Sequence, residues 1–297
     1  MRAITILIQT IVGGIGIGSL YALVALGTSM IYRSMGLINF ANGSIYMVGT
    51  YLGMIWYTGM VGGLKLPYWL SFFLGVISCA ALGLLVERIV RRLADVDLRN
   101  MLIGMIGLGF VLDNLMIIIF GAEGFAAKSP LPSKAINIAG VRILPQNILL
   151  ITVAAILVIG LQIFLTKSKI GKAMRASAMD REIARTMGVH VNMTNAITFA
   201  IGFGLSAAAG ILAAPIVYVN PAMGNAVGTK AFAGAVLGGL GNIPGAIMGG
   251  VTFGVIEALS SGYLSSQYTQ GIAFVVVLVV LMFMPSGILG EKQVDKV

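Results

Sequence analysis

The chain has 297 residues, of which 58% are hydrophobic and 10% are charged, and its formal net charge is +9. Soluble domains average about 25% charged residues, so this composition, with a mean hydropathy of +1.00, excludes a soluble globular protein and indicates an integral membrane protein. The basic residues stand between apolar runs, where the positive-inside rule accounts for them, so the charge does not indicate nucleic-acid binding. Cys79 and His190 are the only residues of their types, which excludes an intrachain disulfide and the usual zinc ligand sets.

The apolar runs predict about eight membrane spans, since a spanning helix needs roughly 20 apolar residues. The first run, residues 4–31, is longer than the hydrophobic region of a signal peptide, so we interpret it as a membrane segment. The later runs cover residues 36–57, 67–90, 101–121, 143–165, 192–219 and 268–284. We therefore predict an all-α fold, a polytopic membrane helix bundle that forms a single transmembrane domain over residues 1–297.

Residues 230–259 depart from this pattern, because two short apolar pieces meet at the sequence Gly241-Asn242-Ile243-Pro244-Gly245. A helix cannot pass through Pro244 between neighbouring glycines without breaking or bending sharply. Irregular backbone at membrane depth persists only where protein or a water-filled cavity covers it. We predict a broken or re-entrant helical hairpin in this region.

Orientation follows from the distribution of Lys and Arg. The loops at residues 88–99 and 166–191 are the basic ones, so we expect both on the cytoplasmic side, together with the tail that carries Lys292 and Lys296. The uncharged connection at residues 258–267 should face outward. This order places the N-terminus outside, although Arg2 weakly opposes that placement.

The segment 166–191 also carries the signals of a short capped helix. Asp180 stands where an N-cap belongs, and Gly188 stands where a left-handed C-terminal residue is needed. Met179, Ile183 and Met187 recur every four residues and form one apolar stripe. The stripe predicts that this helix rests against another surface.

Two sets of polar residues interrupt the apolar runs. Asp113 and Asn114 lie inside the run 101–121, where a charge costs roughly 2.5–3.5 kcal/mol on insertion scales, so they are functional candidates. The structural alternative is that Asp113 faces the bundle interior and is hydrogen-bonded there. Asn39 and Asn42 stand at the start of the second run, where they either cap a helix or line a pathway.

Glu257 and Lys230 frame the hinged region 230–259. They either pair with one another or cap its ends, or they contact a substrate. The sequence contains no nucleotide-binding loop: Gly171-Lys172 is followed by Ala173 and lacks the upstream glycine of that motif. Since metalloprotease and nucleophile-elbow motifs are also missing, the sequence does not indicate an enzyme, and we expect this chain to bind no cofactor.

Many of the 40 glycines fall in small-xxx-small spacing, which lets helix backbones approach closely in lipid. We interpret this spacing as dense packing within one bundle, with a dimer interface to a related subunit as the alternative. The pairs are Gly14/Gly18, Gly49/Gly53, Ser206/Gly210, Gly234/Gly238, Gly245/Gly249 and Gly250/Gly254.

Four blocks of sequence, in unbroken order, resemble the permease subunits of branched-chain amino-acid ABC importers, and within them the shorter, eight-span member of the permease pair. The blocks are GSLYALVALGTSMIYRSMGLINFANGSIYMVGTYL, GKAMRASAMDREIARTMGV, KAFAGAVLGGLGNIPGAIMGGVTFGVIEAL and MPSGILG. The resemblance implies a multi-pass protein of the bacterial plasma (inner) membrane. It also implies a second related permease, two ATPase subunits that bind the ATP, and an extracytoplasmic substrate-binding protein.

The resemblance also assigns residues. It implies that the cytoplasmic loop couples the permease to the ATPase through Gly171, Arg175, Ala176, Asp180, Ala184 and Gly188. For the substrate pathway, matching pattern or polarity within the spans gives Asn39, Asn42, Gly43, Asp113, Asn114, Gly241, Pro244 and Glu257.

Two alternatives remain at this stage. A related importer for urea, amides or short peptides would share the same pattern, because the binding protein usually sets selectivity. A stand-alone secondary transporter would also have broken helices and polar residues near the membrane midplane. The capped helix in the basic loop argues against the second alternative, since a lone carrier has no need of it.

Overall fold

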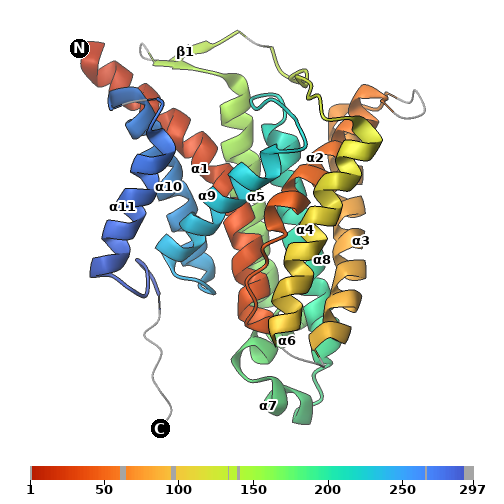
Figure 1. Cartoon of the computed structure of the whole chain (residues 1–297). Helices are drawn as coiled ribbons and strands as arrows, with labels where there is room; N and C mark the ends of the chain where they lie inside the picture. Colours follow the sequence, from red (N-terminus) through yellow and green to blue (C-terminus); the bar gives the residue numbers. More distant parts are fainter. Residues whose placement is uncertain are drawn as a thin grey trace.

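The structure is a computed structural model that describes residues 2–60, 65–94, 98–132, 134–138, 141–264 and 266–290. Residues 95–97 of the predicted basic loop and the tail with Lys292 and Lys296 lie outside the described residues. The described part is a helical bundle with one small β-hairpin (Figure 1). Its elements are α1 (Arg2–Met35), α2 (Asn42–Thr58), α3 (Tyr68–Ala94), α4 (Leu98–Phe120), β1 (Ile136–Ile138), β2 (Val141–Ile143), α5 (Pro145–Lys167), α6 (Lys169–Met179), α7 (Arg181–Thr186), α8 (Val191–Ala213), α9 (Met223–Gly238), α10 (Ile243–Tyr263) and α11 (Thr269–Phe283).

The predicted polytopic helix bundle is confirmed, with the β1–β2 hairpin as its one addition in the described part, but the count of about eight spans is not confirmed. Six helices in the described part are long and apolar enough to cross a membrane, namely α1, α3, α4, α5, α8 and α10. Three further helices of the bundle are shorter: α2 has 17 residues, α9 has 16, and α11, which is apolar, has 15. Because these helices are short, tertiary contacts set their place in the bundle.

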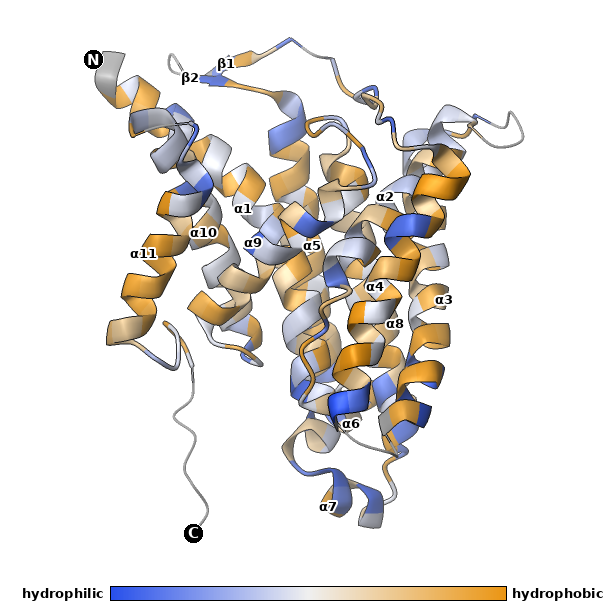
Figure 2. Ribbon diagram, viewed as in Figure 1, coloured by the Kyte–Doolittle hydropathy of each residue, from blue (hydrophilic) through white to orange (hydrophobic). Residues whose placement is uncertain are grey.

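The bundle places α1 and α8 at its centre. In their most apolar windows, 67% of α1 and 78% of α8 is buried, against 22% for α4 and α5. Helices α3, α4 and α11 carry exposed hydrophobic side chains, and their ribbons are largely orange in Figure 2. Such an apolar exterior is what a helix bundle surrounded by lipid requires.

The small-residue faces pack against one another within this one chain, as the first interpretation predicts. A Cβ placed on Gly254 of α10 would lie 2.3 Å from the Cα of Gly18 on α1, and one on Gly250 would lie 2.5 Å from the Cα of Ala22. Between α2 and α8, a Cβ on Gly49 would lie 2.4 Å from the Cα of Ala207. In the absence of a hydrophobic drive within lipid, this close approach supplies the packing energy.

The two ends of the bundle differ. The short helices α6 and α7 project from one end, which also holds the C-terminal end of α11, whereas the N-terminus and the β1–β2 hairpin lie at the other (Figure 1). The adjoining ends of α3 and α4 lie at the α6–α7 end as well. This arrangement agrees with the sidedness that the Lys and Arg residues predict.

The predicted break near Pro244 is confirmed, and it lies slightly earlier than expected. Helix α9 ends at Gly238, and Gly239 and Gly241 adopt positive φ angles of 107° and 83°. The Asn242 side chain then accepts a hydrogen bond from the Gly245 backbone N–H at 3.1 Å and caps α10. Since α10 continues for 21 residues, a re-entrant hairpin with two short arms is not confirmed.

The second span starts differently from the prediction, which began it at Gly36. Helix α2 begins at Asn42, whose Nδ2 donates to the Val24 carbonyl at 2.9 Å and to the Thr28 hydroxyl at 2.5 Å. These partners precede the end of α1 by 7 to 11 residues, which places the start of α2 roughly 10–16 Å along the α1 axis from that end. Residues 36–41 therefore run beside α1 as non-helical backbone inside the bundle.

The α1–α10 contact yields the first prediction. Replacing Gly254 with Ala should reduce the free energy of unfolding by about 1–3 kcal/mol, because the new methyl group would overlap the α1 backbone. Thermal unfolding of the purified protein in detergent measures this change. The matched control is Gly13→Ala, which has open space around its Cβ and should be neutral or slightly stabilising. Equal effects of the two substitutions would contradict the close-packing argument.

Candidate functional site

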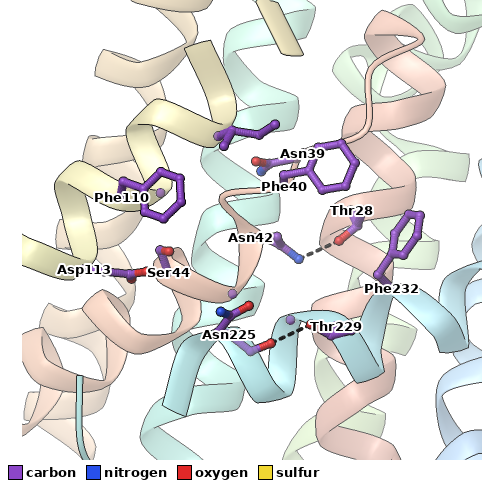
Figure 3. Close-up of a pocket in the computed structure, with 14 residues that line it drawn as sticks. Thr28, Asn39, Phe40, Asn42, Ser44, Phe110, Asp113, Asn225, Thr229 and Phe232 are labelled. Carbon is purple, nitrogen blue, oxygen red and sulfur yellow. Dashed lines mark hydrogen bonds between the residues drawn. The ribbon is translucent and has the colours of Figure 1, made fainter. Parts of the chain in front are cut away.

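A cavity of about 380 Å³ lies where α1, α2, α4 and α9 meet (Figure 3). Small-molecule sites in proteins span roughly 300–1,000 Å³, so the cavity is large enough for a small solute. It is lined by Thr28, Asn39, Phe40, Asn42, Gly43, Ser44, Ile106, Gly109, Phe110, Asp113, Asn225, Gly228, Thr229 and Phe232. Of the predicted pathway residues, the structure thus brings together Asn39, Asn42, Gly43 and Asp113.

Two helices begin at this cavity. The first turn of α2 contributes Gly43 and Ser44 to the lining, and the first turn of α9 contributes Asn225. Neither helix has a side-chain cap on its free N–H groups. Their starts pack tightly, since a Cβ on Gly43 would lie 2.2 Å from the Gly224 carbonyl oxygen. The cavity wall therefore carries the partial positive charge of helix N-termini.

Asn42 holds the start of α2 in place. Besides its two bonds to α1, its Oδ1 accepts a hydrogen bond from the Ser206 hydroxyl of α8 at 2.9 Å. Asn42 is therefore not the cap of α2, and although it lines the cavity its side chain is engaged in bonds to other helices. Its side chain connects α2 with α1 and α8, and the hydrogen bonds that it makes to them are buried.

Asn39 has a different environment. Its Oδ1 accepts a hydrogen bond from the Ala41 N–H at 3.0 Å, which fixes the turn before α2. Its Nδ2 has no hydrogen-bond partner among the described residues, although the side chain is only 3% exposed. A buried donor without a partner is uncommon and calls for an explanation.

Asp113 reaches the cavity from α4 and faces Ser44 (Figure 3). It is the one ionisable side chain among the lining residues. Its Oδ1 is buried without a hydrogen-bond partner in the described part of the chain, and no ion pair to it is found there. Asp113 thus faces the bundle interior, as the structural alternative predicts, with the Ser44 side chain of α2 beside its carboxylate and its Oδ1 left without a partner.

Aromatic rings complete the lining. Phe40 and Phe232 approach one another with ring centroids 6.2 Å apart, and Phe110 lies on the α4 side. Phe40 and Phe110 are both more than half exposed, so the cavity opens to the outside of this chain between α4 and α9. The site thus combines an apolar rim with a polar, anionic interior.

The other predicted pathway residues lie elsewhere. Asn114 is exposed, does not line the cavity, and donates to the Phe110 carbonyl of its own helix at 2.7 Å. Gly241 and Pro244 line a second, wider cavity of about 940 Å³ at the α6–α7 end, together with Arg33 and Met179.

Glu257 forms a separate polar cluster between α1, α9 and α10. One carboxylate oxygen pairs with the Lys230 ammonium, and the other accepts a hydrogen bond from the Tyr21 hydroxyl at 2.7 Å. Both charged side chains are mostly buried. Of the alternatives for Lys230 and Glu257, the structure thus contains the ion pair. Glu257 does not line the cavity.

At the α6–α7 end, the predicted caps are confirmed. The Asp180 carboxylate accepts hydrogen bonds from the Glu182 and Ile183 N–H groups at 2.9 and 3.0 Å. Gly188 adopts a φ of 82°, the left-handed conformation that follows the helix. Helix α7 is therefore short but fixed at both ends by its local sequence.

The predicted apolar stripe does not lie on one helix, because α6 ends at Met179, Asp180 is extended, and Met187 follows the end of α7. Its three side chains nevertheless have no partner surface within the described part of the chain. Met179, Ile183 and Met187 are 82%, 62% and 80% exposed, whereas Ala184 on the opposite face is buried. Figure 1 shows α7 at one tip of the bundle, next to α6. The prediction that the stripe rests on a surface therefore requires another molecule.

The remaining predicted loop residues divide into packed and exposed ones. Gly171 packs against the end of α5, since a Cβ there would lie 2.3 Å from the Phe164 carbonyl oxygen. Arg175 and Ala176 are exposed on α6.

Arg181 anchors the loop, and sequence reasoning did not select it. Its guanidinium donates two hydrogen bonds to the Ser34 carbonyl at the end of α1, the one from Nε at 3.1 Å. The Ser34 hydroxyl in turn donates to Asn195 of α8 at 2.6 Å. Burial, and secondarily the nearby Arg185, lower the pKa of Arg181, but an arginine stays charged at physiological pH. Only the fold distinguishes it from the other basic residues of the loop.

Comparison with known proteins supports a single family. Residues 10–283 match the family model described as branched-chain amino acid transport system / permease component. The chain belongs to this family. It is 36% identical over 300 residues to the high-affinity branched-chain amino acid transport system permease protein BraD of Pseudomonas aeruginosa, with 98% of each chain covered.

Two further relatives agree. The high-affinity branched-chain amino acid transport system permease protein LivH of Escherichia coli is 36% identical over 302 residues, covering 98% of this chain and 97% of that protein. A probable branched-chain amino acid transport permease protein LivH of Methanocaldococcus jannaschii is 30% identical over 307 residues, covering 94% and 91%. The resemblance seen in the sequence is thus confirmed, and the chain is a multi-pass membrane permease.

The Lys230–Glu257 pair yields the second prediction. Lys230→Met should lower the free energy of unfolding by about 3–5 kcal/mol, because it leaves a buried carboxylate without its counter-charge. Thermal unfolding of the permease in detergent measures the loss. Adding Glu257→Gln to the same chain should recover most of it, since a carboxamide is neutral and still accepts from Tyr21. A double variant as unstable as the single one would show that the two charges are not coupled.

Proposed function

We propose that this chain is one of two permease subunits of an ATP-driven importer that carries branched-chain amino acids across the bacterial inner membrane. In this proposal the α6–α7 end faces the cytoplasm, and the β1–β2 end faces an extracytoplasmic binding protein that delivers the substrate. The printed names of the relatives support the substrate class. The α9–α10 pair acts as the broken helical hairpin of the bundle.

The exposed stripe of Met179, Ile183 and Met187 is the observation that carries the proposal. Large apolar side chains that are exposed together to water are typical of a docking site for another protein. The partner is an ATPase subunit, because the sequence of this chain contains no nucleotide-binding loop. ATP therefore binds to two partner subunits, and this chain does no covalent chemistry.

The anchoring of α7 supplies the route for movement. Arg181 bonds to the end of α1, and the Thr194 hydroxyl of α8 donates to Ser177 of α6 at 3.2 Å. A displacement of α7 by the ATPase is thereby passed to the two central helices of the bundle. In alternating access, that displacement opens or closes the path on either side of the substrate.

The path itself includes the cavity between α1, α2, α4 and α9. Its open side between α4 and α9 faces the second, related permease, so that the two subunits enclose the substrate between them. The wider cavity with Gly241 and Pro244 lies nearer to the cytoplasmic end and serves as the inner exit.

The third prediction tests the cap of α7. Asp180→Ala removes the acceptor for two backbone N–H groups, which costs a helix about 0.5–2 kcal/mol. We expect leucine uptake into vesicles that contain the whole complex to fall several-fold while the permease still inserts and assembles. Asp180→Asn is the matched control, because asparagine caps equally well and should transport normally. Wild-type uptake by the alanine variant would remove the coupling role.

The fourth prediction tests docking. Ile183→Asp places a charge in the centre of the stripe and should reduce co-purification of the ATPase subunits by at least tenfold, since an unpaired charge would be buried in the contact. Glu182→Gln alters the neighbouring residue outside the stripe and should leave co-purification unchanged. Pull-down of the tagged permease followed by quantitative blotting provides the measurement. Equal recovery from both variants would contradict the proposed surface.

A further inference from the structure

We propose that the cavity between α1, α2, α4 and α9 is a binding site for a zwitterionic α-amino acid, with the ammonium group at Asp113 and the carboxylate at Asn39 and the first turn of α2. This inference rests on the function proposed above and adds the site, the ligand's orientation and the residues that recognise it.

Asp113 forms the subsite for the ligand's cationic group. No lysine, arginine or histidine is among the described residues that line the cavity, and the Oδ1 of Asp113 has no hydrogen-bond partner among the described residues. The Ser44 side chain faces this carboxylate but carries no charge, and a cation beside the carboxylate would offset the cost of a charge inside a membrane protein. A substrate ammonium supplies the positive charge together with hydrogen-bond donors for the vacant oxygen.

The subsite for the ligand's carboxylate lies next to Asp113. Gly43 and Ser44 line the cavity and belong to the first turn of α2, whose N-terminus has no side-chain cap, and the N–H groups of such a turn are suited to bind an anion. Asn39 adds the unpartnered Nδ2, which is a donor only. The two observations are independent, because one concerns the helix end and the other a buried side chain with an unused donor.

The adjacency of the two subsites favours an α-amino acid as the ligand. Ser44 belongs to the helix N-terminus and also faces Asp113, so the anion and cation subsites are adjacent (Figure 3). In an α-amino acid the ammonium and the carboxylate share one carbon and are adjacent as well. Ligands that carry only one of these groups would leave the other subsite unsatisfied, which is a strong basis for rejection.

The remaining walls fit an aliphatic side chain. Phe40, Phe110, Phe232 and Ile106 form the apolar part of the lining. These rings surround the open side of the cavity, so the charged groups of the ligand point inward and its hydrocarbon end points toward the opening. A leucine, isoleucine or valine side chain would be buried there against the rings.

The test is equilibrium binding to the purified whole complex in nanodiscs, without the binding protein. The probes are L-leucine, 4-methylpentanoic acid, which lacks the ammonium, and 3-methylbutylamine, which lacks the carboxylate. For the wild-type complex we expect leucine to bind at least about tenfold more tightly than either analogue, the ratio that one charged hydrogen bond provides.

Two substitutions should have opposite signatures. Asp113→Asn should weaken leucine and 3-methylbutylamine at least about tenfold and leave 4-methylpentanoic acid unchanged or tighter. Asn39→Asp keeps the acceptor for the Ala41 N–H but replaces the donor by a negative oxygen. It should weaken leucine and 4-methylpentanoic acid and spare 3-methylbutylamine. Asn114→Ala, on the exposed side of α4, is the control and should change none of the three affinities.

The outcomes separate this inference from the proposed function. ATP-driven leucine uptake by wild-type proteoliposomes tests the importer itself, and its absence would contradict the function. Normal uptake combined with equal losses for all three probes in Asp113→Asn would assign the carboxylate a structural role and overturn the site. Failure of Asp113→Asn to assemble with the second permease would also overturn it, because Asp113 would then be paired with a cation of that subunit. Size-exclusion chromatography of each variant complex reports assembly.

Discussion

The hydrogen bonds of Asn42 determine where α2 begins, and the rest of the site depends on that position. One side chain connects the middle of α1 with α8 and holds the first turn of α2 well inside the bundle. Because each of these polar groups is buried, the loss of one bond would leave its partner unsatisfied. With α2 starting at the height of Thr28, Ser44 of its first turn faces Asp113 across the cavity, and Asn225 of the first turn of α9 lines the same cavity.

Helix α1 contacts both parts of the molecule to which the proposed function assigns a role. Its end accepts hydrogen bonds from Arg181 of α7, and its middle accepts those of Asn42 at the cavity wall. Close glycine contacts fix the same helix against α10, and α10 carries the Glu257 that pairs with Lys230 of α9. Under the proposed function, these contacts are the route by which a displacement of α7 would reach the starts of α2 and α9.

Features that depend on neighbouring residues were predictable. The Asp180 cap, the left-handed Gly188 and the break before Pro244 each follow from a few adjacent residues, and the structure contains all three. The in-chain packing of small residues followed from their spacing. The predicted start of α2 was wrong. Hydropathy counts residues 36–41 as part of an apolar run and does not detect that they are not helical. Arg181 was not selected, since nothing local separates it from the other basic residues of its loop.

The sequence by itself determined the membrane class, the family and the local signals of the segment 166–191, since composition, motif order and capping are properties of short stretches. Only the tertiary structure decided which polar residues belong together. It joined Asn39 and Asp113 to the starts of α2 and α9, left Asn114 on the exposed side, and paired Glu257 with Lys230 away from the cavity. These residues are far apart in the chain, and helix packing, which no local pattern encodes, sets the face on which each one lies.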